Sequence, residues 1–127
     1  MKEQGNRHQR SPKKVLYQLR AAEKALELQI EQLYADCVGY SLKNVQCAFI
    51  NASELYVCVE GMEYPFESFL EDWGSVDLLE QMRQAVKQIV GQKIKDTVET
   101  ELSIEASELR HLKPDRRQQL NMLVSLD

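Results

Sequence analysis

The longest regular pattern in this sequence is helical and lies between Pro12 and Gly39. From Val15 to Cys37, apolar residues recur at spacings of three and four, which places side chains on one face of an α-helix. Ser11 before Pro12 suits a helix start, and glycine is common directly after a helix end. The pattern predicts a helix of about 27 residues, roughly 40 Å long. A helix of that length extends beyond an ordinary small sheet.

Two segments with the composition of strands follow this helix, at residues 45–50 and 55–60. Residues 51–54 between them have turn character, so we predict a β-hairpin. With a two- or four-residue turn, Cys47 lies opposite Cys58. One face then carries Ala48, Ile50, Leu55, Val57 and Val59. The other face carries Val45, Cys47, Phe49, Tyr56 and Cys58. Because both faces are apolar in this register, we expect another surface to cover the second one.

A second helical pattern begins at Ser75 or Asp77 and ends near residue 100. Gly91 within it indicates a bend or a close contact. Apolar and polar residues alternate at 102–107 and again at 120–126, which predicts two more strands joined by a polar loop.

The resulting order, α-β-β-α-β-β, predicts an α+β fold. We expect a four-stranded, mostly antiparallel sheet with two long helices packed on it. The fold should form a single domain over residues 12–127, preceded by a basic, flexible tail at residues 1–11.

The composition, with 43% hydrophobic and 28% charged residues, is that of a folded globular protein. The sequence has no run of 18 apolar residues and no secretory signal, which predicts a cytoplasmic protein. Its three cysteines lack CxxC spacing and predict reduced thiols, with a redox pair of Cys47 and Cys58 as the alternative. The first twenty residues carry six basic groups and one acidic group, whereas the rest of the chain is acidic.

The sequence contains no motif that predicts catalysis. Glycine-rich phosphate loops, HExxH and GxSxG are absent, and a Cys-His pair using His8 or His111 is the enzymatic alternative. An acidic run suggests either a cation site or a solvated acidic edge, and its spacing does not match a calcium loop. Its members are Glu60, Glu63, Glu67, Glu71 and Asp72. We therefore predict a protein that is not an enzyme, without a cofactor or a metal site.

An aromatic run after the hairpin and the second hairpin face together predict a partner interface, although core lining would explain the aromatic run equally well. The predicted interface residues are Val45, Phe49, Tyr56, Tyr64, Phe66, Phe69 and Trp73. We expect the partner to be another protein, in a homodimer or a larger assembly.

A basic cluster near the predicted second turn suggests an alternative function. Its members are Arg110, Lys113, Arg116 and Arg117. Such a cluster can hold an anion or nucleic acid, although an acidic body argues against nucleic acid and a solvated loop or docking site would look the same. The alternative functions are thus an RNA- or anion-binding regulatory protein that uses this cluster and the basic N-terminal arm and, third, a small enzyme or ligand sensor.

Two short motifs resemble those of the MpsC-like family. Residues 39–45 have the length and end residues of that family's glycine-rich entry to its first strand, and residues 61–67 reproduce its Gly-x-x-x-Pro-x-Glu signature. The resemblance covers residues 15–127. It implies a small α/β layout and a soluble accessory component of a membrane-potential-generating or inorganic-carbon-linked cation transport system, with membrane contact through a membrane partner. It assigns no catalytic residue and implies a structural role for Gly39, Gly61, Pro65 and Glu67.

Overall fold

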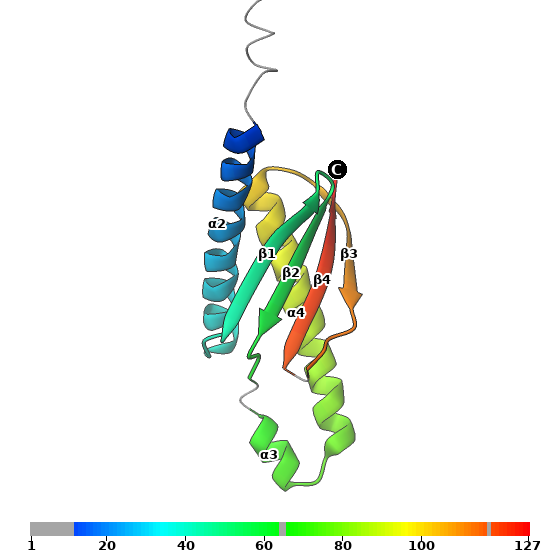
Figure 1. Ribbon diagram of the computed structural model, residues 1–127. Helices are drawn as coiled ribbons and strands as arrows, with labels where there is room; N and C mark the ends of the chain where they lie inside the picture. Colours follow the sequence, from blue (N-terminus) through cyan, green and yellow to red (C-terminus); the bar gives the residue numbers. More distant parts are fainter. Residues whose placement is uncertain (1–11, 64–65, 117) are drawn as a thin grey trace, which may run out of the picture.

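A computed structural model describes residues 12–63, 66–116 and 118–127, and its elements follow the predicted order (Figure 1). The elements are α2 (Pro12–Val38), β1 (Asn44–Asn51), β2 (Glu54–Glu60), α3 (Glu67–Asp72), α4 (Val76–Leu102), β3 (Ala106–Leu112) and β4 (Gln119–Leu126). The predicted α+β fold is confirmed, and the short helix α3 is an addition to it. The predicted tail at residues 1–11 lies outside the described residues.

Helix α2 has 27 residues, as its periodicity predicts. Gly39 follows it with a φ of +88°, a conformation that glycine adopts without a steric penalty. The Gly39 amide donates to the carbonyl of Ala35 at 2.9 Å, which closes the last turn.

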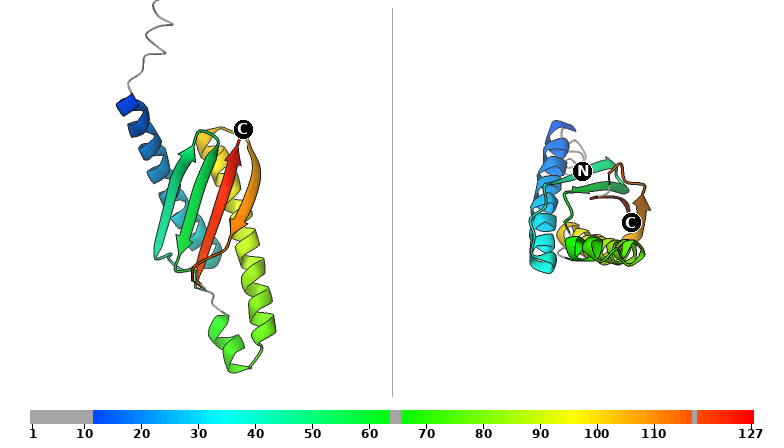
Figure 2. Two further views of the ribbon diagram at one scale, coloured as in Figure 1. Left: turned by 45° about the vertical axis from the view of Figure 1, so that its right-hand side comes forward. Right: turned by 90° about the horizontal axis from the view of Figure 1, so that it is seen from below.

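The sheet has the order β1-β2-β4-β3, and all three pairings are antiparallel. Helix α4 lies on one face of the sheet, here called the inner face, and α2 runs along the β1 edge of the sheet (Figures 1 and 2). Helix α2 packs along β1 and against α4, while α4 reaches β3 and β4. The most deeply buried side chains come from both helices and the three strands β1, β2 and β4; they include Leu26, Ile30, Tyr34, Val45, Val57, Val59, Ile94, Val98, Met122 and Val124.

The predicted register of the first hairpin is wrong by one residue because β1 contains a bulge. The turn is the two-residue one, with Asn51 opposite Glu54, but the register shifts between Phe49 and Asn51, so that Phe49 lies opposite Leu55. Ile50 is the additional residue. A shift of one residue moves every side chain beyond it to the other face of the sheet.

The bulge changes which residues share a face of the hairpin. Val45, Cys47 and Phe49 lie opposite Val59, Val57 and Leu55, and all six contribute to the core or pack against it. The outer face of the hairpin carries Gln46, Ala48, Tyr56 and Cys58, and the bulge residue Ile50 is 59% exposed. The predicted membership of the second face is therefore wrong, because Val45, Cys47 and Phe49 lie on the inner face whereas Tyr56 and Cys58 lie on the outer face.

The bulge also separates the two cysteines that were predicted to face each other. Cys47 pairs with Val57 and points to the inner face, whereas Cys58 points to the outer face, and both are free thiols. Burial, together with the charges of Glu27 and Glu23, raises the pKa of Cys47 to about 12. A thiol with that pKa is almost entirely protonated at neutral pH and is a poor nucleophile.

The third strand begins later than predicted, at Ala106, because α4 continues to Leu102. Ile94, Val98 and Leu102 are spaced by four residues; the first two are fully buried, and Leu102 packs against the core. The alternation at 102–107 therefore belongs partly to the helix stripe.

The close contact predicted at Gly91 is confirmed. A Cβ atom at this position would lie 2.9 Å from Cε1 of His111 and 3.3 Å from Sδ of Met122. Glycine thus allows α4 to approach the sheet. Within the described part of the chain, no helix is long and apolar enough to cross a membrane.

Candidate functional site

The chain leaves the sheet at Gly61, and local geometry requires glycine there. Gly61 has a φ of +80°, and a Cβ atom on it would lie 2.5 Å from Cβ and 2.8 Å from the backbone nitrogen of Lys43. The Lys43 amide donates to the Glu60 carbonyl at 2.9 Å, and the Met62 amide donates to the Gln118 carbonyl at 3.0 Å. These contacts fix the direction in which the chain runs toward α3.

Helix α3 is joined to α4 by an ion pair between Glu67 and Arg83. The Arg83 guanidinium donates to Oε1 of Glu67, and their side chains are 15% and 8% exposed, with Arg83 the more buried. Glu80 and Glu71 lie farther from the guanidinium, at 3.6 Å and 3.9 Å. Burial acts to lower the pKa of Arg83, but the hydrogen bond and charge of Glu67 outweigh it and raise the pKa. The pair therefore holds α3 through a charged group on the buried stripe of α4.

Apolar side chains are exposed where α3 turns into α4. Phe69 and Trp73 are 60% and 73% exposed, and their ring centroids lie 5.7 Å apart. Val76 and Leu78, in the first turn of α4, are 70% and 46% exposed. We call these four residues the aromatic tip. Leu70 of α3 and Leu79 of α4 are buried, so each helix buries an apolar side chain that is not part of the tip.

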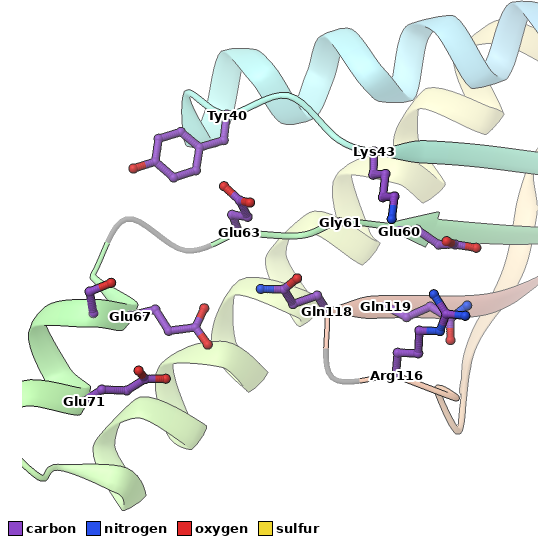
Figure 3. Close-up of a pocket in the computed structure, with 11 residues that line it drawn as sticks. Tyr40, Lys43, Glu60, Gly61, Glu63, Glu67, Glu71, Arg116, Gln118 and Gln119 are labelled. Carbon is purple, nitrogen blue, oxygen red and sulfur yellow. The ribbon is translucent and has the colours of Figure 1, made fainter.

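A polar pocket of about 730 Å³ lies between α3 and the end of the sheet (Figure 3). Glu67 and Glu71 line it from α3, Lys43 and Arg116 lie toward the sheet, and Glu63 lies between them. The other lining residues are Tyr40, Glu60, Gly61, Ser68, Gln118 and Gln119. The pocket is thus rich in carboxylates. Across the described ranges, no group of three or more His, Cys, Asp or Glu side chains is arranged to hold a metal ion.

A comparison with protein-family models matches residues 18–111 to a family described as "Na+-translocating membrane potential-generating system (MpsC)". This chain belongs to the MpsC family. The matched region runs from α2 to β3 and contains both the aromatic tip and the Glu67–Arg83 pair. Comparisons with curated proteins and with solved structures found no match to the chain.

Three of the four residues that carry the MpsC resemblance have structural roles in this chain. Gly39 ends α2, Gly61 passes close to Lys43, and Glu67 pairs with Arg83. Pro65 lies outside the described residues. In this MpsC protein the signature at residues 61–67 thus joins the sheet to α3 and fixes α3 on α4.

The predicted interface residues that the structure describes divide into three groups. Val45 is buried in the core and Phe49 packs against it, so the assignment of these two residues to a free surface is wrong. Tyr56 is half-buried on the outer face, and Phe66 packs against the core. Tyr64 lies outside the described residues. Phe69 and Trp73 are the two predicted interface residues that are strongly exposed.

The predicted basic cluster does not form a single hairpin tip. Arg110 lies within β3 and shares the outer face with its partner Leu123, whereas Arg116 lines the acidic pocket. Lys113 follows the end of β3 and is exposed, and Arg117 lies outside the described residues. The cause is the late start of β3, which places residues 110–112 in the strand.

His111, predicted to lie in a loop, is in β3 and faces α4 at Gly91. Burial and the charge of Lys87 lower the pKa of His111, and burial lowers the pKa of Lys87. The other histidine, His8, lies outside the described residues.

Arg83, Val76 and Leu78 are functional candidates that the structure reveals. A signal for Arg83 was available, because it falls on the stripe of Leu79, Val86 and Val90 that α4 buries. A charged residue on a buried stripe predicts a buried partner of opposite charge. No comparable signal distinguishes Val76 and Leu78 from core residues.

Proposed function

We propose that this protein is a non-catalytic accessory component of a Na+-translocating, membrane-potential-generating system, and that it binds a protein partner through the aromatic tip. The observation that carries the proposal is the exposure of Phe69 and Trp73, at 60% and 73%. Large aromatic side chains supply much of the binding energy at protein interfaces, where they become buried. Membership of the MpsC family supplies the link to the Na+ system.

The charges around the tip favour a basic partner. Glu71, Asp72 and Asp77 are exposed beside the aromatic residues. Carboxylates at the rim of an interface steer and orient a partner of opposite charge. The short cytoplasmic loops of membrane proteins carry an excess of Lys and Arg. We therefore propose that the partner segment is a basic loop with an apolar residue, on a membrane subunit of the system.

A photo-crosslinking experiment in cells tests this proposal. A photoreactive phenylalanine derivative replaces Trp73 in one variant and Gln92 in the other; Gln92 is an exposed residue of α4 that lies outside the tip. We expect irradiation to join position 73, but not position 92, to one integral membrane protein. Equal adducts from both positions, or none that depends on position 73, would contradict the proposal.

A second measurement links docking to function. With the photoreactive residue at neighbouring position 76, the parent should form the same cross-link and the variant Phe69→Gln Trp73→Gln should lose it. Cells that carry this variant in place of the parent should have a lower Na+-dependent membrane potential. The matched control is Ile89→Gln, because Ile89 is an exposed apolar residue of α4, at 56%, outside the tip. If the control and the tip variant lower the potential equally, the tip has no specific role.

A further inference from the structure

The sheet has two edge strands, β1 and β3, because its order is β1-β2-β4-β3. An edge strand presents backbone N–H and C=O groups that have no partner within the sheet and can pair with a strand of another chain. Whether other groups already bond to the edge amides therefore indicates where a second chain can add to the sheet.

The β1 edge is closed by carboxylates of α2. Oε2 of Glu27 accepts a hydrogen bond from the Cys47 amide at 2.9 Å, and Oε2 of Glu23 accepts one from the Phe49 amide at 2.8 Å. These two amides are two residues apart and so point to the same side of the strand. Helix α2 thus takes the place that a further strand would occupy.

The β3 edge is not closed in this way. Ser107, Glu108, Arg110 and His111 are all exposed. A carboxylate meets this strand at its first residue, where Glu99 accepts from the Ala106 amide at 2.8 Å. For amides 107–112, no side chain of the described residues accepts a comparable bond. The strand therefore offers a free edge from residue 107 onward.

The sequence of β3 is complementary to itself when two copies run antiparallel. If the twofold axis passes through Leu109, Glu108 of each copy lies opposite Arg110 of the other. Glu108 and Arg110 pair with Ser125 and Leu123 of β4 and share the outer face, so the two opposite charges would meet directly. Opposite charges across a strand pair contribute about 0.2–1 kcal/mol each, and a twofold dimer has this contact twice.

The exposed charges and the bulge of β3 make pairing with an unrelated strand unfavourable. Exposed charges and a bulge are devices that keep edge strands from pairing at random, and β3 has both, with its register shift between Ala106 and Glu108. An unrelated strand would leave Glu108 and Arg110 without matching charges, whereas a second copy supplies both.

We propose that two copies of this chain dimerise by antiparallel pairing of their β3 strands, centred on Leu109, which joins the two sheets into one. This interface goes beyond the proposed docking function, because it uses a different element from the aromatic tip. The dimer would present two tips to the membrane partner.

Charge reversal tests the pairing, with sedimentation equilibrium of the full chain as the measurement. The parent should form dimers in a concentration-dependent way. Glu108→Arg alone, or Arg110→Glu alone, puts like charges opposite each other and should raise the dissociation constant at least about tenfold. The double variant Glu108→Arg Arg110→Glu should return it to within a few-fold of the parent value. An equimolar mixture of the two single variants should also dimerise, because their heterodimer has both opposite-charge pairs.

Several results would overturn the dimer proposal. These are a parent that stays monomeric up to its solubility limit, single variants that associate like the parent, or a double variant that remains as weak as the single ones. Because Glu108 and Arg110 are exposed, the variants should keep the parent's melting temperature at concentrations where the parent is monomeric, and the single variants should melt below the parent where it is dimeric. Hydrogen exchange measures the backbone pairing directly. The exchange of amides 107–111 should slow as protein concentration rises, whereas the exchange rates of the β1 amides should not change. Phe69→Gln Trp73→Gln should still dimerise, which separates this interface from the tip.

Discussion

Apolar side chains are buried in the body of the molecule, which is the sheet with the two long helices, but several are exposed in the extension formed by α3 and the first turn of α4. In the body, Leu55 and Val57 of β2 have no exposed surface and belong to the core to which both long helices contribute. In the extension, Phe69 and Trp73 keep more than half of theirs. Among the described elements, α3 packs against α4 alone.

This difference indicates which region is available for binding. The body uses its apolar surface to stabilise the fold, so substitutions there affect folding first. Helix α3 is held by the ion pairs of Arg83 with Glu67 and Glu71 and buries only Leu70 among its residues, and regions with little buried apolar surface open locally at low free-energy cost. A binding surface on the extension can therefore change without loss of the fold.

The largest effect is expected at the junction of the two regions. Gly61→Ala combines a left-handed backbone conformation with a Cβ atom 2.5 Å from Cβ of Lys43, and we expect a loss of about 3–4 kcal/mol in the free energy of unfolding. Gly39→Ala is the matched control, because Gly39 also has a positive φ but has nothing within 4 Å of its Cβ position. It should lose about 1–2 kcal/mol. Equal losses in urea denaturation would show that the contact with Lys43 does not matter.

An intermediate effect, confined to the extension, is expected at Glu67. Glu67→Ala leaves the buried Arg83 with the more distant Glu80 and Glu71, and we expect a local cost of about 2 kcal/mol. Hydrogen exchange of the α3 amides should then become roughly thirtyfold faster, while amides of β2 and β4 keep their rates.

The control for this prediction is Glu71→Ala on the same helix. The Glu71 side chain is 51% exposed and lies 3.9 Å from Arg83, and exposed pairs contribute less than about 1 kcal/mol. The comparison between body and extension fails if Glu67→Ala accelerates exchange in the sheet as much as in α3.

The smallest effect on stability is expected at the aromatic tip. Phe69→Ala and Trp73→Ala should each change the free energy of unfolding by less than about 0.5 kcal/mol, because little surface is lost from the folded interior. Leu55→Ala, at a fully buried position, should cost about 3 kcal/mol. Circular dichroism is the suitable probe, since Trp73 is the single tryptophan. A loss at the tip as large as at Leu55 would mean that the aromatic side chains stabilise the fold.

The candidate site was predictable only in part. Phe69 and Trp73 stand out in the sequence because aromatic residues are few there, at 7% of the chain, and the MpsC motifs identify Gly61 and Glu67. Val45 and Phe49 were misplaced because their orientation depends on one bulge residue, Ile50. Bulges arise from the pairing of two strands and leave no clear mark in either strand alone.

The sequence by itself determined the order of the elements and the length of α2, because helical periodicity, Pro12 and Gly39 act within a few residues of chain. Tertiary structure alone decided which side of the hairpin meets the helices and which aromatic residues remain in solvent. It also brought Glu67 to Arg83, sixteen residues away. Side-chain chemistry is the same in a core and on a surface, so only the packing of distant segments separates the two.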